Sequence, residues 1–324
     1  MNKKVTIFGA GAWGTAIAQL LANNGHKVTL WAHNTTIVEE INTHHTNKTY
    51  APQTELHQNI AATADMATAL QSANWLVEAI PVAHLRGIFT KLHAINKKPQ
   101  APWLLLSKGI EQQTNLLPSK ILDEVFGYNL PKAILAGPTF AKELIASAFT
   151  TAMLACEDQI LLSETQQLLQ CPYFKVYPTN DILGVQVGGA VKNVIALAAG
   201  LAHGNGGGEN MHAFLLTQGF AELALLINLY GGQPATSTGL AGLGDLVLTA
   251  SSTTSKNYRA GLLLAQGATL ATLPQEMATM PEGINTVQSL HQLCTQHNLH
   301  LPLCSLVYKC VFNGDSFMDQ LRNL

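Results

Sequence analysis

Charged side chains are scarce in this 324-residue chain: Asp, Glu, Lys and Arg make up 12% of it, about half of the ~25% that is usual in a globular protein. Hydrophobic residues make up 47%. With so few charges to cover a surface, we expect an apolar helical face to be hidden in a homodimer. The formal net charge is -2 and the sequence has no basic block, which excludes the electrostatic footprint of a nucleic-acid-binding protein.

Cysteine pairs are also lacking. The five cysteines are odd in number and contain no C-x-x-C pair, so the sequence predicts neither a disulfide framework nor a metal site. We therefore expect a protein of the reducing cytoplasm. The start of the chain, MNKK, runs into the apolar residues 5–8 and then meets glycines, which indicates a first strand and not an export signal.

The chain length predicts two domains, because 324 residues exceed what one hydrophobic core usually serves. From residue 5 to about 178, short apolar runs alternate with segments whose apolar residues recur every three or four positions. The apolar runs lie at residues 5–8, 27–31, 75–80, 103–107, 133–136, 150–155 and 174–177, and the helical segments at 16–23, 85–92, 116–126 and 159–169. This alternation predicts an α/β fold over residues 1–180, a Rossmann-type, doubly wound, mostly parallel sheet. Long Leu-, Ala- and Gly-rich stretches predict an all-α domain over residues 181–324.

One of these stretches, residues 182–202, is long and apolar enough to raise the question of a membrane span. Its four glycines and a central lysine, which costs roughly 3 kcal/mol on membrane insertion, favour a buried helix instead. Glycines four positions apart would let another backbone approach closely.

A glycine pattern follows the first predicted strand. Gly9, Gly11 and Gly14 form G-x-G-x-x-G at the start of a predicted helix, which is the context that a dinucleotide-binding loop needs. The glycines permit a tight turn and close approach of a pyrophosphate, and the helix N-terminus offers free N–H groups to the anion. A glycine-rich turn without a ligand is the alternative.

The end of the second predicted strand bears on cofactor choice. An NAD-selective site usually places Asp or Glu there to hold the ribose 2′-hydroxyl, but this chain has Ala32, His33 and Asn34. With no carboxylate to repel a 2′-phosphate, we expect NADPH to be accepted as well as NADH. His33 could equally be an ordinary surface residue.

Two further strand ends carry candidate ligand-binding residues. Lys108 follows the run at 103–107, and Gly137 and Thr139 follow the run at 133–136. Ligands bind at the carboxyl edge of open α/β sheets. Thr139 can cap the helix that follows, and a capped N-terminus suits a phosphate or carboxylate. An exposed lysine and a purely capping threonine are the alternatives.

Lys192 is the hardest residue to explain structurally, because burying an ammonium group in an apolar helix costs several kcal/mol unless it is paired or deprotonated. A carbonyl that receives a hydride must also receive a proton, and a lysine whose pKa is lowered by burial and by a second cation can supply it. Lys108 is the candidate second cation and Asp245 the candidate orienting carboxylate. A structural ion pair, and Asp245 as a helix cap, are the alternatives.

The sequence closely resembles the bacterial NAD(P)-dependent glycerol-3-phosphate dehydrogenases. Five segments spread over most of the chain carry the resemblance: residues 9–15 (GAGAWGT), 137–143 (GPTFAKE), 188–193 (GGAVKN), 241–246 (AGLGDL) and 282–283 (EG). The resemblance implies reversible reduction of dihydroxyacetone phosphate to sn-glycerol 3-phosphate for phospholipid synthesis.

The resemblance also implies roles for individual residues. Lys192 matches the family's proton donor and acceptor, with Lys108 and Asp245 beside it. The positions implied to contact substrate are Lys108, Gly137, Thr139, Lys192, Asp245, Ser255, Lys256 and Asn257. The positions implied to contact NAD or NADP are Gly9, Gly11, Ala12, Trp13, Gly14, His33, Lys108, Ala141, Lys256, Met280 and Glu282.

The chain departs from the family pattern at two positions. The arginine of a Ser-Arg-Asn element is Lys256 here, which exchanges a bidentate phosphate ligand for a point charge. The arginine of a Thr-Arg-Gly segment is Gln218. Phosphate binding should be weaker or altered unless Arg259, three residues after Lys256, takes part.

Two other functions remain open at this stage. A related dehydrogenase of a 3-hydroxy acid or a polyol phosphate would share the fold and the helix lysine. A non-catalytic NAD(P)-binding regulator would need the glycine loop but not a buried lysine. A methyltransferase that binds S-adenosylmethionine in the glycine loop is a weaker alternative than these two, because it has no use for a buried lysine.

Overall fold

The computed structural model describes residues 2–71, 73–277 and 279–324. The chain forms two compact units: unit 1 comprises Met1–Ser107 and Ser119–Ile182, and unit 2 comprises Lys108–Pro118 and Leu183–Leu324. Unit 2 therefore takes in a short segment from the first half of the chain as well as the C-terminal half.

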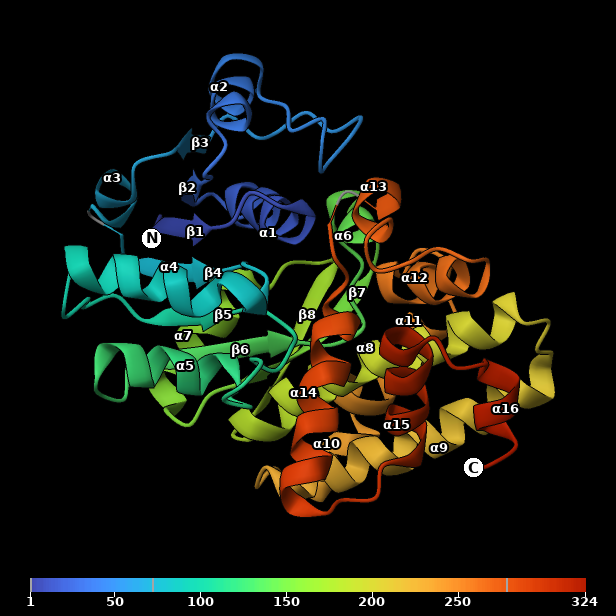
Figure 1. Ribbon diagram of the computed structural model, residues 1–324. Coiled ribbons are helices and arrows are strands. Elements are labelled where there is room, and N and C mark those ends of the chain that lie inside the picture. Colours follow the sequence, from blue (N-terminus) through green and yellow to red (C-terminus); the bar gives the residue numbers. More distant parts are fainter. Residues whose placement is uncertain (1, 72, 278) are drawn as a thin grey trace. The chain divides into compact units, whose positions relative to one another are not determined.

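Within the described residues, unit 1 is built on one eight-stranded sheet of order β3-β2-β1-β4-β5-β6-β7-β8 (Figure 1). All neighbouring strands are parallel except β6 and β7, which are antiparallel. The strands are β1 (Lys4–Phe8), β2 (Lys27–Trp31), β3 (Ile60–Thr63), β4 (Trp75–Glu78), β5 (Trp103–Leu105), β6 (Lys132–Ala136), β7 (Thr150–Ala155) and β8 (Phe174–Thr179). The helices are α1 (Ala12–Asn23), α2 (Thr35–His44), α3 (Met66–Leu70), α4 (Val82–Ile95), α5 (Pro118–Phe126), α6 (Ala141–Ile145) and α7 (Gln159–Leu169).

Neighbouring side chains of β1 point to opposite faces of the sheet, and each face is covered by its own set of helices. Ile7 belongs to the core that contains α1, α2 and α7, whereas Phe8 stacks on Trp103, whose ring meets Phe89 of α4 and Phe126 of α5. Successive side chains of a strand point to opposite faces, so the sheet is covered on both sides. The predicted doubly wound, mostly parallel sheet is confirmed.

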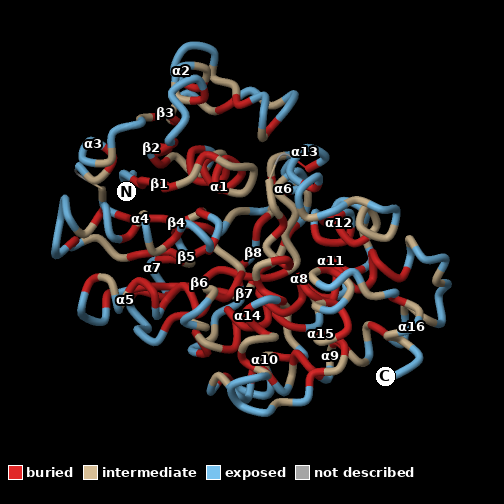
Figure 2. The backbone as a smooth tube through the Cα atoms, viewed as in Figure 1, coloured by how far each residue is buried: buried red, intermediate tan, exposed pale blue. Residues whose placement is uncertain are grey.

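From α8 onward, the described part of unit 2 contains only helices. Its elements are α8 (Ile182–Gly204), α9 (Glu209–Leu229), α10 (Pro234–Thr238), the π-helical η1 (Leu240–Gly244), α11 (Asp245–Ala250), α12 (Lys256–Ala265), α13 (Leu273–Met277), α14 (Glu282–His297), α15 (Pro302–Tyr308), the π-helical η2 (Lys309–Asn313) and α16 (Phe317–Leu321). Among the described residues, two helices, α8 and α9, are long and apolar enough to cross a membrane by length and composition. The most apolar window of α8 is 94% buried inside the protein (Figure 2), as expected for a core helix.

Candidate active site

Lys192 of α8 and Asp245 at the start of α11 meet because a glycine lets their segments touch. A Cβ atom built on Gly188, one turn before Lys192, would lie 2.4 Å from the carbonyl oxygen of Ala241. Any side chain at Gly188 would push away the π-helical turn that leads into Asp245. The expectation that helix glycines admit a close backbone is met at this position.

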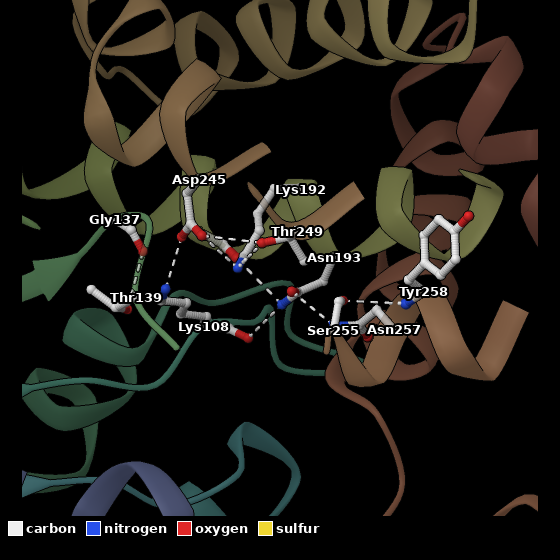
Figure 3. A network of polar contacts seen from close by, with 11 residues as sticks. Lys108, Gly137, Thr139, Lys192, Asn193, Asp245, Thr249, Ser255, Asn257 and Tyr258 are labelled. Carbon is white, nitrogen blue, oxygen red and sulfur yellow. Dashed lines mark hydrogen bonds and ion pairs between the residues drawn. The ribbon is translucent and has the colours of Figure 1, made fainter. Parts of the chain in front are cut away.

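Asp245 joins two lysines through its two oxygens (Figure 3). Lys192 Nζ lies 2.7 Å from Oδ1, and Lys108 Nζ lies 2.8 Å from Oδ2. Lys192 is 6% exposed and Asp245 is fully buried. Lys192 and the two partners that the sequence suggested for it therefore form one charged cluster within unit 2.

The electrostatics of this cluster suit proton transfer. Burial lowers the pKa of Lys192 to about 8; the charge of Asp245 opposes this shift and the charge of Lys108 adds to it. Burial alone would raise the pKa of Asp245, but the charges of Lys108 and Lys192 outweigh it and the pKa lies below its ordinary value. Lys192 can thus gain and lose a proton near neutral pH while Asp245 stays ionised.

Thr249 completes the cluster, and sequence reasoning did not identify it. Its Oγ1 accepts a hydrogen bond from Lys192 Nζ at 2.7 Å and donates to Asp245 Oδ1 at 3.2 Å. Thr249 lies four residues after Asp245 on α11, so both face the same side of the helix. That spacing was the available signal. The carboxylate of Asp245 is engaged here, and α11 has no side-chain cap, so the reading of Asp245 as a helix cap is wrong.

A second polar chain fixes the backbone around the cluster. Asn193 Nδ2 donates to the carbonyl oxygens of Gly189 at 3.3 Å and Lys108 at 3.5 Å. Its Oδ1 accepts from Asn257 Nδ2 at 2.9 Å, and Asn257 Oδ1 accepts from the amide of Gly283 at 2.8 Å. The described contacts of Asn257 therefore tie α8 to the start of α14.

Residues 255–257, which were predicted to lie near the substrate phosphate, form the start of α12. Ser255 caps this helix by accepting a hydrogen bond from the amide of Tyr258. Lys256 Nζ donates to Thr279 Oγ1 at 3.0 Å. Loss of hydration, and then the charge of Arg259, lower the pKa of Lys256. Two cations one helical turn apart thus share an electrostatic environment at the start of α12.

The glycine loop in unit 1 has the shape of an anion cradle. Gly9 has φ +115°, and a Cβ there would lie 2.4 Å from the carbonyl oxygen of Ala79. Helix α1 starts at Ala12, directly after Gly11, with no side-chain cap, which leaves its first N–H groups available to a phosphate. Trp13 Nε1 is buried with no hydrogen-bond partner among the described residues. These features fit a dinucleotide.

Asn47 holds this loop from behind, and no sequence signal pointed to it. It is fully buried, and its Nδ2 donates to the carbonyl oxygen of Ala10 and to Thr15 Oγ1, both at 2.9 Å. At the end of β2, His33 is exposed and Asn34 caps α2 by accepting from the amide of Thr36. No carboxylate stands at residues 32–34.

The turn after β6 differs from expectation. Thr139 Oγ1 donates to the carbonyl oxygen of Gly137 at 3.1 Å. The residue at the N-cap of α6 is Phe140, with no side-chain cap bond, so the prediction that Thr139 caps this helix is wrong. Ala141 is the first residue of α6, which packs against α1 within unit 1.

The remaining predicted residues lie in unit 2. Met280 and Glu282 are half-buried at the entry to α14. Gln218, one of the two departures, donates to Glu222 Oε1 at 3.1 Å. Glu222 also accepts from the amides of Leu303 and Cys304, so Gln218 takes part in the packing of α9 against α15.

Comparisons with known proteins agree over the whole chain. Residues 4–162 match the family model described as "NAD-dependent glycerol-3-phosphate dehydrogenase N-terminus", and residues 181–322 match its C-terminal counterpart. The chain is 37% identical over 323 residues to a glycerol-3-phosphate dehydrogenase [NAD(P)+] of Bacillus cereus, covering 99% of this chain and 95% of the relative. It is 39% identical over 318 residues to the same-named protein of Lysinibacillus sphaericus, covering 96% and 92%. The crystal structure of glycerol-3-phosphate dehydrogenase from Coxiella burnetii matches with TM-score 0.95 at 29% identity, covering 99% and 98%.

Proposed function

Because the chain belongs to the NAD-dependent glycerol-3-phosphate dehydrogenase family, we propose that it catalyses the reversible NAD(P)-dependent reduction of dihydroxyacetone phosphate to sn-glycerol 3-phosphate. The observation that carries this proposal is the buried cluster in which Asp245 lies 2.7 Å from Lys192 and 2.8 Å from Lys108. A non-catalytic regulator would gain nothing from a lysine held at a pKa of about 8.

The residues of the cluster have separate tasks. Bound NAD(P)H supplies the hydride. Lys192 gives the proton from Nζ to the substrate oxygen and takes it back in the reverse direction. Asp245 and Thr249 orient that Nζ through hydrogen bonds. Lys108 keeps the pKa of Lys192 low and offers a positive charge to the developing alkoxide.

Binding roles follow the family positions. Gly137, Thr139, Ser255, Lys256 and Asn257 would surround the substrate, with Ser255 and Asn257 acting mainly through the loops they fix. The dinucleotide would be held by Gly9, Gly11, Ala12, Trp13, Gly14, His33, Lys108, Ala141, Lys256, Met280 and Glu282. Residues 1–180 would thus supply most of the cofactor-binding positions, and residues 181–324, with Lys108, would supply the catalytic groups. The product would feed phospholipid synthesis in the cytoplasm.

We further propose a homodimer that uses α9. Only 33% of its most apolar window is buried, and Phe214, Leu225 and Leu229 are 44–46% exposed. Val247 of α11, a helix that contacts α9, is 47% exposed. Between residues 210 and 229 the only Asp, Glu, Lys or Arg is the buried Glu222. An uncharged face suits a second copy of itself better than a charged partner.

The decisive experiment follows the absorbance of NADPH at 340 nm with purified protein and dihydroxyacetone phosphate. Oxidation that depends on this substrate is expected. Absence of oxidation would overturn the enzyme assignment. If NADPH is oxidised faster with a 3-keto acid or with another ketose phosphate than with dihydroxyacetone phosphate, the related dehydrogenase would be favoured.

A further inference from the structure

A second fully buried carboxylate, Glu78, lies outside the Lys192 cluster. It is the last residue of β4 and is 0% exposed. The other residues of this strand are Trp75, Leu76 and Val77. A carboxylate in such surroundings costs several kcal/mol unless its oxygens accept hydrogen bonds, so its contacts should show what it does.

The contacts of Glu78 join the ends of two central strands of unit 1. Oε1 accepts from the amide of Ile80 at 2.5 Å. Oε2 accepts from Ser107 twice, from Oγ at 2.5 Å and from the amide at 3.2 Å, and more weakly from the amide of Leu106 at 3.4 Å. All four donors are neutral. Both strands also end earlier than predicted: residues 79–80 and 106–107 were predicted as strand, but β4 ends at Glu78 and β5 at Leu105.

The position of Ser107 gives this arrangement a consequence for the reaction. Ser107 is the last residue of unit 1 before the chain enters Lys108–Pro118 of unit 2. The next residue is Lys108, whose Nζ lies 2.8 Å from Asp245. Both the side chain and the amide of Ser107 are fixed by one carboxylate, so the backbone that leads into Lys108 begins from a rigid point.

We propose that Glu78 is a positioning residue for catalysis, which fixes Ser107 and thereby keeps Lys108 in register with Asp245 and Lys192. The inference rests on the proposed function, since it assigns Glu78 to the reaction of that cluster. Burial raises the pKa of Glu78, and the hydrogen bonds from Ser107 and Ile80 oppose the shift. Both oxygens of Glu78 have hydrogen-bond donors, so the surrounding backbone is arranged to accept this carboxylate.

The test is the Glu78→Gln variant, which keeps the size of the side chain but turns one acceptor into an N–H donor facing other donors. We expect kcat to fall by about ten- to a hundred-fold, the range for small misplacements of catalytic groups. The alkaline limb of the pH profile should move to higher pH, because the charge of Lys108 lowers the pKa of Lys192. A purely structural role would not move that limb.

Glu222→Gln is the matched control. Glu222 is also buried and accepts from two backbone amides, those of Leu303 and Cys304. This variant should lower the thermal unfolding temperature but leave the pH limb in place. A Glu78→Gln enzyme with wild-type kcat and an unmoved limb would overturn the inference, whereas inactive wild-type protein would overturn the proposed function instead.

Two further measurements keep the test decisive. If Glu78→Gln does not fold, Ser107→Ala removes only the hydroxyl contact, and the limb should move in the same direction by less. Amide hydrogen exchange of the 107–118 peptide needs no turnover. We expect it to quicken at least about tenfold in either variant, the equivalent of one lost hydrogen bond of ~1.4 kcal/mol. Unchanged exchange would count against a role for Glu78 in fixing Ser107.

Discussion

The Nζ atom of Lys192 lies 2.7 Å from Oδ1 of Asp245, and the two side chains are only 8% and 1% exposed. A buried ion pair rarely repays its desolvation as stability. The second lysine on the same carboxylate makes the arrangement costlier still, since Lys108 and Lys192 repel each other. The stability that such a cluster gives does not explain it, which supports the proposed role in proton transfer.

Replacing Lys192 by Ala should abolish most turnover, because it removes the proposed proton donor from the buried cluster with Asp245. We expect kcat to fall by about 10²- to 10⁴-fold, the usual contribution of a general acid, while the affinity for NADPH measured by fluorescence titration stays the same. Lys132→Ala is the control, since the buried Lys132 forms an ion pair with the half-buried Asp123 in unit 1 at 2.7 Å. It should lose stability and keep kcat. Parallel loss of turnover and cofactor affinity in Lys192→Ala would make Lys192 structural.

The pH dependence should report Lys192 directly. Its pKa is about 8, and reduction needs the protonated form. The kcat/KM for dihydroxyacetone phosphate should therefore be flat below pH 8 and fall about tenfold per pH unit above it. Oxidation of sn-glycerol 3-phosphate needs the neutral amine and should rise up to pH 8 and then level off.

The Lys108→Met variant tests whether the alkaline limb of the pH profile reports the pKa of Lys192. Lys108 lowers the pKa of Lys192 through its charge, so its removal should raise that pKa and move the alkaline limb of reduction to higher pH. Turnover should fall too. A limb that stays at its wild-type position, or moves to lower pH, would contradict the assignment of the limb to Lys192.

Much of the fold could be predicted because its signal is local. Every strand of the sheet with a run of large apolar residues was found, including β1, β2 and β7. The strand missed was β3 (Ile60–Thr63), whose sequence IAAT has only one large apolar residue. The neighbouring α3 spans five residues, too short to show a helical period. Pairing with β2, and not local propensity, makes β3 a strand.

The site was predictable in its charges but not in its neutral supports. A lysine in an apolar helix is conspicuous, because burial without a partner is unfavourable. Thr249, Asn193 and Asn47 are not, because short polar residues occur throughout such a chain. Thr139 was misread because its hydroxyl has two possible partners close in sequence, and it bonds Gly137 instead of the helix.

Binding of the substrate phosphate should depend on Lys256 and Arg259. A hydrogen bond to a charged group contributes about 1.5–3 kcal/mol, so Lys256→Ala and Arg259→Ala should each raise the KM for dihydroxyacetone phosphate by about 10- to 100-fold. Lys256→Arg, which restores a planar bidentate donor, should lower it. Lys175→Ala, on β8 beside Phe149, is the control and should leave it unchanged. Wild-type KM values in both alanine variants would count against this phosphate subsite.

The preference between NADPH and NADH should depend on the residues that follow β2. The wild-type enzyme, with His33 exposed and no nearby carboxylate at residues 32–34, should use both NADPH and NADH. His33→Asp should raise the KM for NADPH, because a carboxylate repels the 2′-phosphate, and should leave or improve the KM for NADH through the 2′-hydroxyl. Side-by-side initial rates with the two cofactors measure this. An equal change for both would show that His33 does not face the ribose.

The assembly should depend on the exposed face of α9. Leu225 is 46% exposed there, and a carboxylate at this position would be buried without a partner in a dimer, at a cost of several kcal/mol. Leu225→Glu should therefore convert a dimer to a monomer in sedimentation-velocity runs. Ile160→Glu is the matched control, since Ile160 of α7 in unit 1 is 75% exposed and lies on a different helix. It should sediment as the wild type does. A wild-type protein that sediments as a monomer would contradict the homodimer, and a Leu225→Glu variant that remains dimeric would show that the dimer does not use this face of α9.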